Sequence, residues 1–239
     1  MTAPQRWATA PIQGLLLDAV GTLVALREPP AQVYARIAVR HGIALHAADL
    51  EAELARALAS VAPPRLEGVP PEGIPALERE AWRERVRRTL GSDPAGGPCF
   101  EELFEHYGRA DAWRVLPGAR AALELARERG VRRAVVSNMD ARLAAVLREL
   151  GLARLLDAIV LPSNSGGAAK PAARIFHIAL ERIGVAPDRA LYIGDRERGC
   201  IEGARAVGLR VLRYDPAGQG PPGERLGGWV ELGRYLSNP

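Results

Sequence analysis

The chain has 239 residues, of which 48% are hydrophobic, and its 32 basic and 28 acidic residues leave a net charge of +4. These apolar residues suffice for a core of ordinary size, and the length suits either one domain with a sizeable insertion or two small domains. The arginines are scattered and stand beside glutamates, as in Arg83-Glu84-Arg85, so the positive charge indicates a solvated surface and argues against a nucleic-acid-binding patch.

The first predicted element is a buried strand at residues 15–17, an apolar run that ends on Asp18. In open α/β sheets, ligands bind in the crevice beyond the carboxyl ends of the strands. A lone carboxylate that a buried strand delivers to that edge is placed for chemistry rather than packing. Asp18 is therefore the first candidate catalytic residue.

From residue 24 to about residue 112 the apolar residues recur at helical spacing, which predicts a helical insertion. Two stripes are predicted to face its core, formed by Val33, Tyr34, Ile37 and Ala38 and by Leu50, Leu54 and Leu58. A loop rich in proline and glycine follows at 61–75. A charged helix is predicted at 77–90, and Phe100, Leu103, Phe104 and Tyr107 mark a fourth.

From Pro117-Gly118 onward, helices alternate with short strands, which indicates βα units on a parallel sheet. Strands are predicted at 131–136, 158–161, 190–193 and 209–213. Helices are predicted at 118–129, after a cap at Asp140, from Pro171 to 183, at 197–207 and at 229–236.

Three more polar positions are expected at the sheet edge that holds Asp18. Ser137-Asn138 ends the strand 131–136, and Gly194-Asp195 ends the strand 190–193. Lys170 precedes Pro171 at a predicted helix start, where free backbone N–H groups favour an anion. Lys170 is also the only lysine in the chain, which indicates a position that requires a compact ammonium group.

Asp18 with Thr22, Ser137-Asn138, Lys170-Pro171 and Gly194-Asp195 resemble, in this order, the four motifs of the haloacid dehalogenase-like (HAD) superfamily. The resemblance covers nearly the whole chain and is closest to subfamily I, whose members carry a helical C1 cap. It implies an α/β fold with a Rossmann-like, doubly wound parallel sheet. The core domain would comprise residues 1–27 and 113–239, and the inserted α-helical cap domain residues 28–112.

The resemblance also implies roles for individual residues. Asp18 would be the covalent nucleophile, and Lys170 would neutralise charge between it and a phosphoryl group. Phosphate binding is assigned to Thr22, Ser137, Asn138 and Lys170. The implied cofactor is Mg²⁺, held by Asp18, Asp195 and the backbone carbonyl of Val20.

Two positions depart from the family pattern. Val20 stands where the phosphatases carry a second aspartate, their general acid and base, and Cys200 replaces the second acid of the fourth motif. A thiol cannot replace an anionic oxygen as a ligand for hard Mg²⁺. We therefore expect weak metal binding and slow turnover, unless another acid such as Glu197 reaches the site.

Three functions remain open at this point. The preferred one is a magnesium-dependent phosphatase that acts through an aspartyl-phosphate on Asp18. The second is a catalytically weak or silent HAD-fold binding module, which the replacements at Val20 and Cys200 favour. The third is a 2-haloacid dehalogenase-like hydrolase. The first motif of those enzymes is also similar to the run Asp18-Ala19-Val20-Gly21-Thr22-Leu23. Gly194-Asp195, by contrast, is typical of the phosphatases.

Cysteine usage and apolar runs indicate the compartment. Cys99 and Cys200 lie far apart, which predicts neither a disulfide framework nor a zinc site. The first residues lack the apolar core of a signal peptide, and no run approaches the roughly 18 residues of a membrane span. We expect a cytoplasmic protein whose partner is a small phosphorylated metabolite or another small molecule, with neither a membrane nor a nucleic-acid partner. The sequence leaves open the substrate, the oligomeric state and whether the 61–75 loop shapes the active site.

Overall fold

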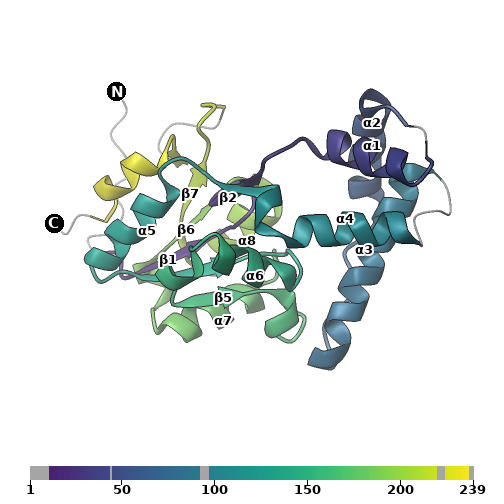
Figure 1. Cartoon of the computed structure of the whole chain (residues 1–239). Helices are drawn as coiled ribbons and strands as arrows, with labels where there is room; N and C mark the ends of the chain where they lie inside the picture. Colours follow the sequence, from purple (N-terminus) through teal and green to yellow (C-terminus); the bar gives the residue numbers. More distant parts are fainter. Residues whose placement is uncertain (1–10, 44, 92–96, 220–223, 237–239) are drawn as a thin grey trace.

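The five apolar segments predicted as strands and a sixth, unpredicted strand at 225–226 form a parallel sheet in the computed structural model (Figure 1). The structure describes residues 11–43, 45–91, 97–219 and 224–236. The strand order is β5-β4-β1-β6-β7-β8. The strands are β1 (Gly14–Leu17), β4 (Arg132–Val136), β5 (Ala158–Val160), β6 (Ala190–Gly194), β7 (Arg210–Tyr214) and β8 (Arg225–Leu226).

The strand order places β1 at the centre of the sheet, paired with β4 on one side and β6 on the other. Leu17 is in register with both Val135 and Ile193, so the three strands end at nearly the same level. The chain runs outward from β1 to β4 and β5 and then returns to β6 and β7. This reversal is the topological switch point at which open α/β sheets bind ligands.

Alternation along β1 divides the sheet between two cores. Leu15 and Leu17 pack with α5 (Ala119–Glu128) and α6 (Arg142–Glu149), whereas Leu16 packs with α7 (Ala173–Ile183) and α8 (Glu202–Ala206). All three leucines are completely buried. A strand covered on both faces explains why the sequence shows an unbroken apolar run here. The prediction of a doubly wound α/β fold is confirmed.

Four helices lie together beside the sheet and form the helical insertion (Figure 1). They are α1 (Pro30–Arg40), α2 (Ala47–Ser60), α3 (Ile74–Leu90) and α4 (Pro98–Gly108). Their shared core includes Tyr34, Ile37, Phe100 and Leu103. The chain enters and leaves the insertion through an antiparallel pair of strands, β2 (Val24–Leu26) and β3 (Trp113–Val115), which the sequence pattern did not predict.

Several boundaries and faces differ from the expectation. Leu58 was predicted to face the insertion core, but 64% of it is exposed, because it lies on the outer side of α2. Residues 197–207 form a π-helical turn (Glu197–Ile201) followed by the short α8. The last helix is a 3₁₀ helix (Trp229–Arg234). In the described ranges, no helix combines the length and apolarity that a membrane crossing requires.

The 61–75 loop approaches the segment that leads to Lys170. A 3₁₀ turn (Pro71–Gly73) ends the loop, and α3 begins at Ile74. A Cβ atom built on Gly167 would lie only 2.7 Å from the amide nitrogen of Glu67 and would also contact the carbonyl of Leu66. The main chain of the loop therefore packs directly against residue 167, three residues before Lys170.

Candidate active site

Strand ends bring the predicted site residues to one edge of the sheet. Asp18 directly follows β1, and its amide donates to the carbonyl of Ile193 at 2.9 Å. Ser137 directly follows β4, and its amide donates to Val160 at 3.1 Å. Asp195 directly follows β6. Because β1 lies between β4 and β6 in the sheet, these three side chains begin on adjacent strands.

Asp18 is a buried carboxylate with a buried cation beside it. Its exposed fraction is 6%, and Oδ1 accepts hydrogen bonds from the amide of Ala19 at 2.8 Å and from Nζ of Lys170 at 2.7 Å. The other oxygen, Oδ2, accepts a longer contact of 3.5 Å from Sγ of Cys200. A buried carboxylate needs such a partner, because removing an unpaired charge from water is costly.

Lys170 is held at both its main chain and its side chain. The side-chain amide of Asn138 accepts from the Lys170 amide at 2.7 Å and donates to its carbonyl at 2.8 Å. Nζ also donates to the hydroxyl of Tyr192 at 3.2 Å. The predicted helix start at Pro171 is wrong: the amide of Ala172 bonds the carbonyl of Ala169 at 2.9 Å, forming a turn, and α7 begins at Ala173.

Asp195 has a carboxylate oxygen without a protein partner. Its Oδ1 atom is buried and makes no hydrogen bond to the described residues. Burial, followed by the negative charge of Asp18, raises the pKa of Asp195. A cavity of about 730 Å³ opens next to Asp195 and Gly21. A buried oxygen without a hydrogen-bond partner, close enough to Asp18 to feel its negative charge, suits an oxygen-preferring cation.

The donor set for such a cation is small. Within the described part of the chain, no three His, Cys, Asp or Glu side chains gather as a metal site would require. The residues present therefore fit Mg²⁺ only if two carboxylates, a main-chain carbonyl and water molecules share it. Mg²⁺ commonly keeps several waters and takes one or two protein carboxylates, so the fit holds.

Thr22 and Ser137 place buried hydroxyl groups in the two turns that follow β1 and β4. Thr22 is fully buried, and its Oγ1 atom has no hydrogen-bond partner among the described residues. The Ser137 hydroxyl accepts from the amide of Met139 at 3.2 Å, and 3% of the residue is exposed. The indole Nε1 of Trp229 donates to the carbonyl of Thr22 at 2.9 Å and so holds the first turn from the C-terminal segment.

Sequence reasoning missed Tyr192. It was counted only as part of the apolar strand 190–193, but its hydroxyl touches Lys170, and its ring packs edge-on against Phe176 with centroids 5.4 Å apart. Alternation along β6 was the available signal, because a tyrosine facing a core needs a partner for its hydroxyl. Burial raises the pKa of Tyr192 well above its usual value, so the hydroxyl stays protonated.

Cys200 and Glu197 were the other candidates for a role in chemistry at Asp18, and the surroundings of both restrict such a role. Burial raises the pKa of the Cys200 thiol, so it remains neutral beside Asp18. Glu197, which was considered as a replacement acid, forms an ion pair with Arg205 at 3.3 Å, and 46% of its side chain is exposed. Asp140 lies one residue before Ala141, the N-cap residue of α6, and its Oδ1 accepts from the amide of Arg142 at 3.0 Å in the first turn of the helix.

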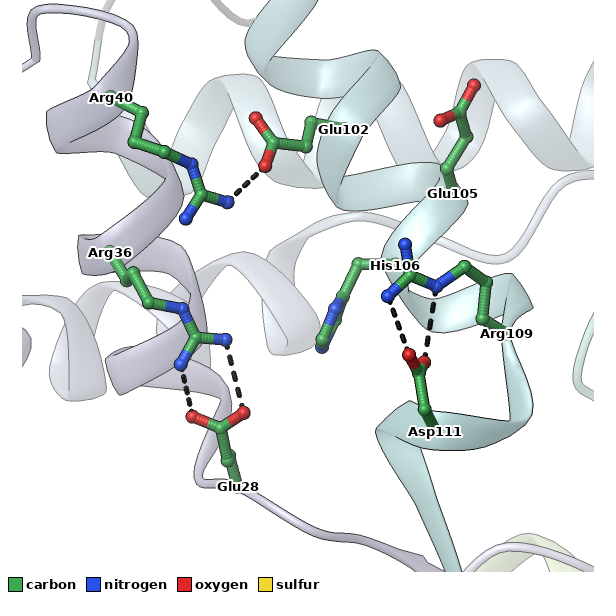
Figure 2. Close-up of a pocket in the computed structure, with 8 residues that line it drawn as sticks. All are labelled: Glu28, Arg36, Arg40, Glu102, Glu105, His106, Arg109 and Asp111. Atoms are coloured by element: carbon green, nitrogen blue, oxygen red, sulfur yellow. Dashed lines mark hydrogen bonds and ion pairs between the residues drawn. The ribbon is translucent and has the colours of Figure 1, made fainter.

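A second pocket, of about 330 Å³, lies in the helical insertion and is lined by charged side chains (Figure 2). Figure 2 shows that each of its three arginines faces a carboxylate, in the pairs Arg36–Glu28, Arg40–Glu102 and Arg109–Asp111. Burial, with the nearby charge of Arg36, lowers the pKa of His106 in the same pocket. Because its guanidinium groups are already paired, this pocket is a weaker candidate for phosphate than the sheet edge.

The chain is similar to known proteins in both sequence and fold. The family model of the haloacid dehalogenase-like hydrolases matches residues 12–208. Haloacid dehalogenase-like hydrolase domain-containing protein 3 of Bos taurus is 34% identical over 202 residues, covering 82% of this chain and 78% of that protein. A phosphoserine phosphatase of Thermus thermophilus is 36% identical over 148 residues, covering 60% and 59%.

Among solved structures, a HAD phosphatase from Thermococcus onnurineus superposes with a TM-score of 0.67 at 22% identity. The superposition covers 95% of this chain and 99% of the other. At this identity the likeness concerns the fold.

Proposed function

This chain belongs to the haloacid dehalogenase-like hydrolase family, and from that membership we propose that it is a magnesium-dependent phosphatase acting through Asp18. The observation that carries the proposal is the buried, unpartnered Oδ1 of Asp195. Arg196 faces the other oxygen of Asp195 at 3.9 Å, but a buried carboxylate oxygen without a hydrogen-bond partner is costly unless a cation binds it. A carboxylate placed to bind a metal ion favours phosphoryl transfer over carbon–halogen hydrolysis, in which the halide leaves without the help of a metal ion.

The cation would be held by Asp18, Asp195 and the backbone carbonyl of Val20. When bound, Mg²⁺ supplies positive charge that stabilises the oxygens of a transferring phosphoryl group. The replacement of the second acid by Cys200, whose thiol stays neutral, supports weak binding. The rest of the mechanism concerns the side chains of this protein.

Asp18 is the nucleophile in this proposal. One of its oxygens forms a bond to phosphorus while the bond from phosphorus to the leaving oxygen breaks, and water then hydrolyses the aspartyl-phosphate. Lys170, 2.7 Å from Asp18, holds positive charge where the phosphoryl oxygens gather. Thr22 and Ser137 contribute hydroxyl groups that bind the phosphoryl oxygens. The side chain of Asn138 already bonds Lys170, so its phosphate contact falls to its main-chain amide.

Val20 limits the range of substrates. A missing general acid typically costs about 10² to 10⁴ in rate, and the loss is greatest for leaving groups of high pKa. Glu197 is paired with Arg205, which supports the view that it does not replace the missing acid. We therefore propose aryl and acyl phosphates as the best substrates. The partner is a small phosphorylated molecule.

The domain division and the compartment belong to the same proposal. The antiparallel pair β2–β3, where the chain enters and leaves the insertion, supports a boundary of the cap domain at residues 28 and 112. Two buried free thiols, Cys99 and Cys200, support a reducing compartment such as the cytoplasm.

Hydrolysis of p-nitrophenyl phosphate, with and without Mg²⁺, tests the proposal. The comparison is between the wild type, Asp18→Asn and the control Asp188→Asn, which changes an exposed aspartate on the turn before β6. We expect activity that requires Mg²⁺ and that only Asp18→Asn abolishes. Equal inactivity of all three folded proteins would favour the alternative, a silent binding module, to which the replacements at Val20 and Cys200 point.

A further inference from the structure

A carboxyl group from the helical insertion reaches the loop that carries Ser137. Glu78 lies on α3, and only 7% of it is exposed. Its Oε2 atom accepts a hydrogen bond of 3.3 Å from the amide of Ala141, 63 residues along the chain. Ala141 is four residues after Ser137 and directly precedes α6.

The same loop makes a second contact with the insertion through Arg142. The guanidinium of Arg142 is paired with Asp140 by bonds of 2.8 and 2.6 Å, and it also donates to the carbonyl of Phe104 on α4. It lies 3.5 Å from the centroid of the Phe104 ring and 5.2 Å from that of Trp82 on α3. Two helices of the insertion thus hold residues 141–142.

These contacts act on the candidate phosphate site because the loop is short and bonded at both ends. The Ser137 hydroxyl accepts from Met139 within the loop, and Asn138 is bonded to Lys170. Few residues between Ala141 and Ser137 can therefore rotate freely, so a displacement of Ala141 also displaces Ser137. Among the described residues, Glu78 forms a hydrogen bond with the amide of Ala141 and none with Asp18 or Lys170, so any influence it has on catalysis passes through this loop.

We propose that Glu78 is a positioning residue, which holds the Ser137 loop in its phosphate-binding arrangement only while the inserted helices are docked on the core. The proposal rests on the phosphatase function proposed above. It extends that function by naming a residue of the insertion that controls substrate affinity. Glu78 does not touch the reacting atoms in this scheme.

The charges around Glu78 make this control sensitive to pH. Burial raises the pKa of Glu78 to about 7, and Asp140 adds to the rise, whereas the Ala141 amide and Arg142 oppose it. Below pH 7 the carboxyl group is neutral and its buried contact carries no charge. Above pH 7 a second negative charge is buried near Asp140. The packing of the inserted helices on the core is therefore less stable at high pH. Because this packing holds the Ser137 loop, KM rises with pH.

Three variants test the proposal. Glu78→Leu removes the acceptor of the Ala141 hydrogen bond, and Glu78→Gln keeps an acceptor but cannot ionise. The matched control is Glu80→Gln, which changes a largely exposed glutamate of the same helix. The measurements are kcat and KM for p-nitrophenyl phosphate from pH 6 to 8.5 and the Kd of inorganic phosphate by calorimetry.

We expect Glu78→Leu to raise KM and the phosphate Kd about fivefold, the effect of losing one hydrogen bond of about 1 kcal/mol, with kcat nearly unchanged. Glu78→Gln should keep the low KM and lose the part of the pH dependence centred near 7. If Glu78→Leu and Glu80→Gln have the same KM and phosphate affinity, the proposal is overturned.

An inactive wild type would refute the phosphatase function without deciding the role of Glu78. Amide hydrogen exchange then decides it. Glu78→Leu should speed exchange across residues 137–142 while α7 exchanges as before, whereas unchanged exchange in that loop would overturn the positioning role.

Discussion

Replacing Gly21 by alanine should disable the site by moving Asp195, and Gly42 offers a matched control. Both glycines have left-handed backbones, with φ of +84° at Gly21 and +76° at Gly42. An alanine in that region costs about 1–2 kcal/mol at either position. The two variants should therefore lose similar amounts of stability from the backbone alone.

The two positions differ in what the added methyl group meets. At Gly21 the Cβ atom would lie 2.8 Å from Cγ of Asp195 and would overlap its Oδ2, whereas at Gly42 nothing lies within 4 Å. Ordinary contact requires at least about 3.5 Å between carbon atoms, so the Asp195 carboxylate has to move by roughly 1 Å. A displacement of about 1 Å in a catalytic arrangement can cost about 100-fold in rate.

The assay combines steady-state kinetics on p-nitrophenyl phosphate with urea unfolding of both variants. We expect Gly21→Ala to lose about 100-fold in kcat/KM and to require more Mg²⁺, and Gly42→Ala to keep wild-type kinetics. Similar stability losses with full activity in both would refute the reasoning, because Asp195 would then not act at the reaction centre.

Three further changes test separate parts of the site. Val20→Asp should raise turnover of alkyl phosphates by at least about tenfold relative to aryl phosphates, because it places an acid near Asp18, the proposed nucleophile; an unchanged ratio would count against that account. Cys200→Asp should strengthen Mg²⁺ binding, seen as a larger rise in melting temperature on adding Mg²⁺, and an equal rise in both proteins would contradict a metal near residue 200. Burial raises the pKa of Glu78 from 4.5 to about 7, so the contribution of Glu78 to stability is greatest below pH 4.5 and falls by up to about 3 kcal/mol as the pH rises through 7. Glu78→Gln should lack that decline in urea unfolding at pH 5 and 8; parallel curves would show that Glu78 does not titrate in the folded protein.

The elements that could be predicted are those whose signal is local in the sequence. Residues 15–17 form an unbroken apolar run because β1 is covered on both faces. The alternation of strands and helices after residue 117 likewise follows from periodicity. Since parallel strands end at one edge, the placement of Asp18, Ser137 and Asp195 at that edge was predictable as well, although the adjacency of their strands was not.

Local pattern was insufficient where a boundary or face depends on packing. The stripe of α2 correctly included Leu50, which is buried, but Leu58 is exposed, because the width of the buried face depends on which helices cover it. The start of α7 was placed too early, since a proline is compatible with the first helical turn but also with the turn that the chain forms at 169–172.

Only the tertiary structure decided which side chains meet at the site. Tyr192 bonds Lys170 across 22 residues, Cys200 reaches Asp18 across 182, and Glu78 reaches Ala141 across 63. Such contacts depend on strand order and on how the insertion packs against the sheet, and no periodicity along the chain encodes them. The sequence alone determined the chemistry available at the sheet edge, and the fold decided which groups orient it.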